Sequence, residues 1–177
     1  MNTDNKVQSL SVRSVTFGAL TIALIVVFFT LFKGVTNILN AFFVPITLFS
    51  FSINRKASEL LAVSVGAIVI CALFFNLQLI FIAFYCIIAL ILSILNRKNA
   101  GIVLSVITLT IVVTLFFWIA IILTDSLFKT RMSEIMLKLM NGNRVNYIML
   151  LTFEGTVVGI SQLFASRLIL RKLRAFE

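Results

Sequence analysis

The chain alternates between long apolar runs and short polar breaks. Six runs contain few or no charged residues, and most of them are long enough to cross the hydrocarbon layer of a bilayer as an α-helix. We therefore predict an all-α integral membrane protein that forms a single transmembrane domain over residues 1–177 as a six-helix bundle. The six predicted spans are residues 15–32, 38–53, 57–75, 78–95, 101–124 and 145–168.

Two of these spans need comment. The first runs on to Lys33 without a small-residue cleavage site, so we expect it to be retained rather than removed as a signal peptide. The second, residues 38–53, is short and contains Pro45, the only proline in the chain. Proline lacks a backbone N–H, so a kink is expected there, and a re-entrant segment is the alternative to a full crossing.

Composition and charge support the membrane assignment and add an orientation. The chain is 61% hydrophobic and 12% charged, whereas soluble domains are about half apolar and about a quarter charged. The net charge of +9 is spread over small clusters between the runs, which does not indicate nucleic-acid binding. Ten of the 15 lysines and arginines lie on the side of the termini. The positive-inside rule then predicts a multi-pass protein of the bacterial cytoplasmic membrane, with both termini in the cytoplasm.

The connection between the fifth and sixth spans has its own pattern. Residues 126–140 are predicted to form a short amphipathic helix on the outer side, with Glu134 and Lys138 as an i,i+4 pair. This helix either rests on lipid or forms a lid over an outward-facing cavity. Its apolar residues recur at helical spacing and are Phe128, Met132, Ile135, Met136 and Leu139.

Glu154 lies in the middle of an otherwise apolar run, MLLTFEGTVVGISQLFAS. The nearest basic residue within a predicted span is Arg167, more than three helical turns away. Either Glu154 stays protonated and hydrogen-bonded within the bundle, or its carboxylate interacts with a ligand or with the water of a cavity. We favour the ligand or cavity.

Further polar and aromatic residues are predicted in the outer halves of the spans. Trp118 and Tyr147 are also typical of aromatic belts at membrane interfaces, and asparagines also cap helices. The predicted ligand-binding residues are Glu154, Trp118, Tyr85, Tyr147, Asn76, Gln78 and Asn40.

Catalytic chemistry is not expected. Histidine is absent, no phosphate-binding loop of the GxxxxGK[ST] type occurs, and the carboxylates do not cluster. Cys71 and Cys86 lie within apolar runs and are predicted to be small buried hydrophobes, and no metal or cofactor is expected. Glu59 follows Arg55 by four residues, so a local ion pair is predicted.

Two pairs of small residues are spaced four apart, Ala19 with Ala23 and Gly155 with Gly159. Such pairs allow helix backbones to approach closely. They serve either packing within the bundle or docking of another membrane subunit.

The segments VRSVTFGALTIALIVV and FFVPITLFSFSINRKASELLAVSVGAIV, with six spans in this length, resemble the substrate-binding S components of energy-coupling factor (ECF) transporters. The resemblance implies that Ala19 and Ala23 contact a transmembrane coupling subunit driven by two cytoplasmic ATPases. It also implies ligand binding toward the outer side, among helices four to six and the first outer loop. The histidine-based signature of the nickel and cobalt members is absent.

We therefore predict a subunit that captures a small vitamin-like nutrient from outside. One alternative is a membrane scaffold that resembles the small rod-shape protein of the cell-wall elongation machinery. Another is a proton-coupled transporter that uses Glu154 as its carrier site.

Overall fold

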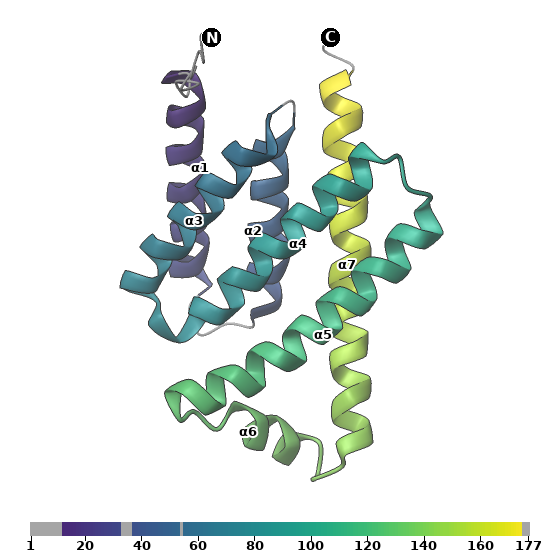
Figure 1. Ribbon diagram of the computed structural model, residues 1–177. Helices are drawn as coiled ribbons and strands as arrows, with labels where there is room; N and C mark the ends of the chain where they lie inside the picture. The colour runs from purple at the N-terminus through teal and green to yellow at the C-terminus, as the bar shows by residue number, and fades with distance from the viewer. Residues whose placement is uncertain (1–11, 33–36, 54, 175–177) are drawn as a thin grey trace, which may run out of the picture.

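The computed structural model describes residues 12–32, 37–53 and 55–174, and these residues form helices and turns without a strand. The helices follow one another along the chain (Figure 1). They are α1 (Val12–Leu31), α2 (Asn37–Ser52), α3 (Ala57–Phe74), the 3-10 turn η1 (Asn76–Gln78), α4 (Leu79–Arg97), α5 (Ile102–Phe128), α6 (Met132–Leu139) and α7 (Arg144–Arg174).

Five stretches of this chain are long and apolar enough to cross a membrane: α1, α3, α4 with η1, α5, and α7. The prediction of an all-α membrane protein is therefore confirmed for the helical class and for these five stretches. The helix at the second predicted span, α2, is shorter, with 16 residues. At 1.5 Å per residue it is about 24 Å long, against about 30 Å for the hydrocarbon core of a bilayer.

The short α2 is the central helix of the bundle, and it contacts α1, α3, α4 and α7. Its side chains Ala41, Val44 and Leu48 are fully buried. Pro45 lies inside this helix, which continues through it from Asn37 to Ser52. Because other helices surround α2 along much of its length, its apolar residues face protein rather than lipid.

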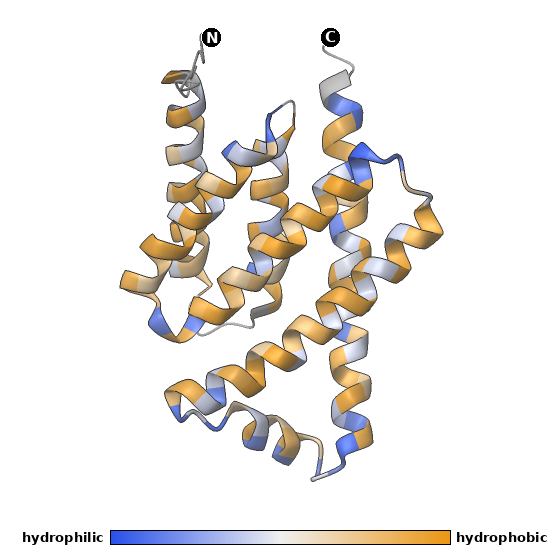
Figure 2. Cartoon of the chain, viewed as in Figure 1, coloured by the Kyte–Doolittle hydropathy of each residue, from blue (hydrophilic) through white to orange (hydrophobic). Residues whose placement is uncertain are grey.

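The helices around α2 expose apolar side chains on their outer faces. Leu20 on α1, Val69 on α3 and Ile111 on α5 are all more than half exposed. Hydrophobic residues cover most of each long helix, and hydrophilic residues gather near the helix ends and turns (Figure 2). A surface of this kind is stable against lipid tails and unstable in water.

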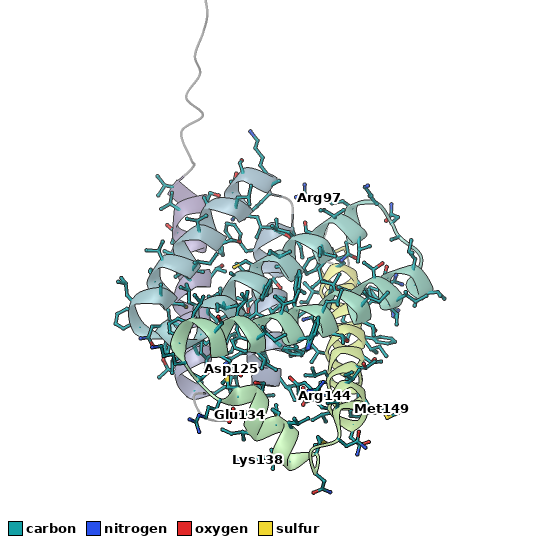
Figure 3. All side chains as sticks on the ribbon, turned by 60° about the horizontal axis from the view of Figure 1, so that its bottom comes forward. Arg97, Asp125, Glu134, Lys138, Arg144 and Met149 are labelled. Carbon is teal, nitrogen blue, oxygen red and sulfur yellow. The ribbon has the colours of Figure 1, made fainter. Side chains whose placement is uncertain are left out.

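The two ends of the bundle differ. Val12, where α1 begins, and Arg174, where α7 ends, lie at the same end, and α6 lies at the other (Figure 1). We call these the terminal end and the α6 end. Arg97 lies at the terminal end, whereas Glu134 and Lys138 lie on α6 (Figure 3).

Arg55 ties α1 to α3 at the terminal end. Its guanidinium donates to Ser14 Oγ at 2.5 Å and to Glu59 Oε2 at 3.3 Å, and the Ser14 hydroxyl donates to Glu59. The same guanidinium lies 4.7 Å from the ring centre of Phe51. The predicted Arg55–Glu59 ion pair is confirmed, and Ser14 extends it to a second helix.

The most extensive contact between two helices joins α5 and α7, and two glycines make it possible. A Cβ atom at Gly155 would lie 3.0 Å from the backbone nitrogen of Thr114 and would also meet the hydroxyl of that threonine. At Gly159 it would lie 3.2 Å from the backbone nitrogen of Thr110. Gly155 and Gly159 are buried against α5. Their assignment to a partner-docking face is therefore corrected to packing within the chain.

Candidate functional site

An apolar cavity of about 310 Å³ lies on the inner side of α6. Five helices contribute to its wall. The N-terminal ends of α2 and α4, the last turns of α5, the helix α6 and the N-terminal half of α7 meet there. The lining residues are Ile38, Phe81, Phe117, Ile121, Met132, Ile135, Met136, Leu151 and Glu154.

Glu154 is the only polar residue in this lining. It shares one face of α7 with Tyr147 and Leu151, at positions i, i+4 and i+7, and its side chain is partly buried. Among the described residues it forms neither a hydrogen bond nor an ion pair. A carboxylate in an apolar cavity is favourable only with a hydrogen-bond donor or a cation beside it. The cavity therefore contains one hydrogen-bond acceptor without a partner among the described residues, surrounded by eight apolar side chains.

The amphipathic helix α6 closes one side of this cavity through Met132, Ile135 and Met136. It begins at Met132, later than the predicted residue 126, because α5 continues to Phe128. Ile135 and Leu139, predicted on the apolar face, are 58% and 67% exposed. Of the predicted apolar face, Met132 and Met136 are partly buried against the bundle, and Leu137 and Met140, which were not predicted there, are partly buried beside them.

Asp125, near the end of α5, fixes where α6 begins. Its Oδ1 accepts hydrogen bonds from the backbone N–H of Met132 at 2.8 Å and from the Thr130 hydroxyl at 2.5 Å. Its Oδ2 accepts from the backbone N–H of Ser133 at 2.8 Å and from the Ser133 hydroxyl at 2.5 Å. The intervening Lys129 has the left-handed φ of 52° that ends α5. Asp125 thus acts as a distant N-cap for α6 (Figure 3).

The charged face of α6 differs from the predicted pairing. The Glu134 carboxylate lies 4.0 Å from Arg131 Nε, three residues earlier, and not within ion-pair distance of Lys138. Both side chains of the observed pair are more than half exposed, so the pair contributes little to stability.

The predicted aromatic ligands do not border the cavity. Tyr85 is buried behind it, with its ring centre 6.4 Å from that of the lining residue Phe81. Tyr147 is buried on α7, two turns before Glu154. Trp118 is 47% exposed and lies beside the exposed Ile119 on the outer surface of α5. This exposed position favours the aromatic-belt alternative over ligand binding for Trp118.

The predicted amide ligands also lie outside the cavity lining. The Asn76 side chain is exposed, and its Oδ1 accepts the backbone N–H of Leu77 at 2.8 Å. Gln78 Oε1 and both amide atoms of Asn40 are buried without a hydrogen-bond partner among the described residues. Asn40 is fully buried in α2. Of the seven predicted ligand-binding residues, Glu154 alone borders the cavity.

The lining residues from α2, α4 and α5, and Leu151 of α7, were not predicted from the sequence. Phe81, Phe117 and Leu151 are apolar residues in apolar helices, so their position gives no signal of a cavity. The spacing of Met132 and Met136 did indicate one face of a helix, and that face is the one that covers the cavity. Cys71 and Cys86, predicted as buried thiols, are buried and free.

No protein-family model, no curated protein and no solved structure matches this chain.

Proposed function

We propose that this protein is a membrane-embedded binding subunit that captures a small nutrient in the cavity beside Glu154. This proposal rests on the carboxylate of Glu154, which lies in an otherwise apolar cavity of about 310 Å³ without a hydrogen-bond or ion-pair partner among the described residues. Cavities that bind small molecules are typically apolar with a few well-placed polar groups, and this volume lies near the lower end of their range.

The lining specifies the chemistry of the ligand. Glu154 selects a cationic or hydrogen-bond-donating group, and a charge-assisted hydrogen bond to it contributes about 1.5–3 kcal/mol. Phe81 and Phe117 accept an apolar or aromatic body. Met132 and Met136 have flexible side chains that adapt to its shape. The ligand class is a small vitamin-like molecule with a flat apolar body and one basic or donor group.

Retention of the ligand tests this site. The protein is purified from its host in mild detergent, and the small molecules it releases on denaturation are identified by mass spectrometry. Glu154→Gln removes the charge and keeps the shape, so we expect at least tenfold less of the retained compound. Glu134→Gln is the matched control, because Glu134 is an exposed acid on α6 outside the cavity lining. Equal retention by Glu154→Gln and the wild type would refute the site.

We further propose that a separate ATP-driven membrane module completes uptake, since the chain has no phosphate-binding loop. The exposed pair Ala19 and Ala23 on α1 supports this docking, because neither alanine is buried within the chain. Ala19 also borders a groove of about 250 Å³ between α1 and α3. Under the proposal, Ala19→Leu with Ala23→Leu abolishes co-purification of two ATPases and a membrane subunit. Leu24→Phe, on a different part of the exposed surface of α1, is the control.

The terminal end is assigned to the cytoplasm on the basis of its basic residues. In a background with both native cysteines changed to alanine, Lys98→Cys and Lys138→Cys place one exposed thiol at each end. A membrane-impermeant maleimide added to intact cells should label Lys138→Cys, and it should label Lys98→Cys only after permeabilisation. The reverse pattern would place the cavity on the cytoplasmic side and exclude capture from outside.

A further inference from the structure

A second cavity lies at the terminal end. It is lined by the end of α4, the turn between α4 and α5, the start of α5 and the last turns of α7. Its volume is about 470 Å³. Its polar lining residues are Asn96 and Asn99 from α4 and the turn, Ser105 from α5, and Arg167 and Arg171 from α7. The lining contains no acidic residue, so this cavity carries a net positive charge.

The two arginines lie four residues apart and therefore share one face of α7. Arg167 Nη2 donates to the backbone oxygen of Ala100 at 3.3 Å, which holds this guanidinium at the turn between α4 and α5. In the described part of the chain, neither arginine forms an ion pair with a carboxylate. Each guanidinium has five N–H donors, so most of these donors remain available to a ligand.

The start of α5 adds a second source of positive potential. Gly101 is the N-cap residue and offers no side-chain hydrogen bond, and the first intrahelical bond runs from the Ser105 N–H to the Gly101 oxygen. The N–H groups of residues 102–104 consequently have no acceptor within the helix. Gly101 and Ile102 line the cavity, so the positive end of the α5 dipole faces the same space as the two arginines.

The rest of the lining is apolar and leads to the lipid-facing surface. Leu95, Ile102, Leu163 and Leu170 line the cavity beside the polar groups. The next residues of α5, Val103 and Leu104, are 72% and 60% exposed. A ligand that fits this arrangement has an anionic head and an apolar tail that continues into the bilayer.

We propose that this cavity binds the phosphate group of an anionic membrane phospholipid between Arg167, Arg171 and the start of α5. The planar guanidinium matches phosphate oxygens with two parallel hydrogen bonds. Basic pockets between transmembrane helices are recurrent sites for acidic lipid headgroups. The site is separate from the Glu154 cavity and does not depend on its function.

Native mass spectrometry of the full chain in detergent micelles tests this site. The protein is titrated with phosphatidylglycerol, with phosphatidylcholine of the same acyl chains, and with inorganic phosphate. The variants are Arg171→Gln, Arg167→Lys and the double variant Arg167→Gln with Arg171→Gln. The matched control is Lys98→Gln with Lys172→Gln, which removes two exposed charges from the same end outside the cavity lining. Arg171 is exposed, so Arg171→Gln remains informative even if the double variant misfolds.

We expect the wild type and the lysine control to prefer phosphatidylglycerol over phosphatidylcholine. The double arginine variant should bind phosphatidylglycerol about tenfold more weakly, and Arg171→Gln should show part of this loss. Arg167→Lys keeps the charge without the planar donors, so it should lie between the wild type and the double variant. Equal losses in the arginine and lysine variants would overturn the proposal, as would equal binding of the two lipids. Saturation by low-millimolar inorganic phosphate with no preference for phosphatidylglycerol would reassign the site to a soluble phosphate.

Discussion

The side-chain amide of Gln162 on α7 donates a 2.7 Å hydrogen bond to the backbone oxygen of Ala41 on α2. In a regular helix this oxygen would accept the N–H of residue 45, but Pro45 has none. Gln162 therefore satisfies the carbonyl that the proline leaves without a donor. Ala41 and Gln162 are both fully buried, and an unsatisfied carbonyl is unfavourable in such a position.

Removal of this hydrogen bond should be more destabilising while Pro45 is present than after it is replaced. Gln162→Leu is expected to destabilise the protein by about 1–3 kcal/mol, because it leaves the Ala41 oxygen without a donor. In a Pro45→Ala background the backbone N–H is restored, so the same change should be at least about twofold less destabilising. Equilibrium unfolding of the four proteins in mixed micelles measures this coupling. Equal losses in the two backgrounds would show that Gln162 acts independently of the proline.

The α5–α7 crossing should be sensitive to a single methyl group. Gly155→Ala places a Cβ against the backbone of Thr114, which cannot move without separating the helices, so a loss of about 1–3 kcal/mol is expected. Gly66→Ala is the matched control, because its Cβ meets only Cδ1 of Ile22 at 2.9 Å, the end of a flexible side chain. Thermal unfolding of both variants in the same detergent distinguishes them. A Gly66→Ala loss as large as that of Gly155→Ala would contradict close backbone packing at Gly155.

Asp125 should control the order of α6 without affecting α7. Asp125→Ala removes the acceptor of two backbone N–H groups and two hydroxyls, and N-cap losses of this kind are about 1 kcal/mol. Amide hydrogen exchange over residues 132–139 should accelerate about fivefold, whereas exchange in the middle of α7 should not change. Glu134→Gln serves as the control acid on α6. If exchange in α6 is unchanged in Asp125→Ala, the helix is held by its packing alone.

Trp118 should report on lipid rather than on ligand. It is the only tryptophan, it is 47% exposed on α5, and it lies outside the lining of the Glu154 cavity. In bilayers its fluorescence should be quenched by lipids with brominated acyl chains. Addition of the compound that the purified protein retains should leave the emission unchanged. A ligand-dependent spectral shift, with no quenching by these lipids, would place Trp118 at a binding site instead.

The long apolar runs allowed the helical architecture to be predicted, because a backbone in lipid must satisfy its own hydrogen bonds and does so within each helix. The predicted spans match the helices to within a few residues, except where α5 and α7 continue beyond residues 124 and 168. The sequence also isolated Glu154, because a carboxylate in an apolar run is unusual whatever the fold.

Tertiary structure decided which residues lie near Glu154. Ile38, Phe81 and Phe117 belong to three different helices, and nothing in their local sequence distinguishes them from apolar residues that face lipid. Local sequence also does not distinguish Tyr85 from Trp118. Both lie in apolar helices, but Tyr85 is buried and Trp118 is exposed.

The sequence by itself determined that this is a helical membrane protein. Long apolar runs are stable in lipid, and a backbone in lipid must form its hydrogen bonds within each helix. Only the tertiary structure decided that α2 is central and that Gly155 packs internally. It also decided that Gln162 donates to the carbonyl that Pro45 leaves without a donor, and that α6 covers Glu154. These features depend on distances between segments far apart in the chain, and helix periodicity specifies the face of a helix but not its neighbour.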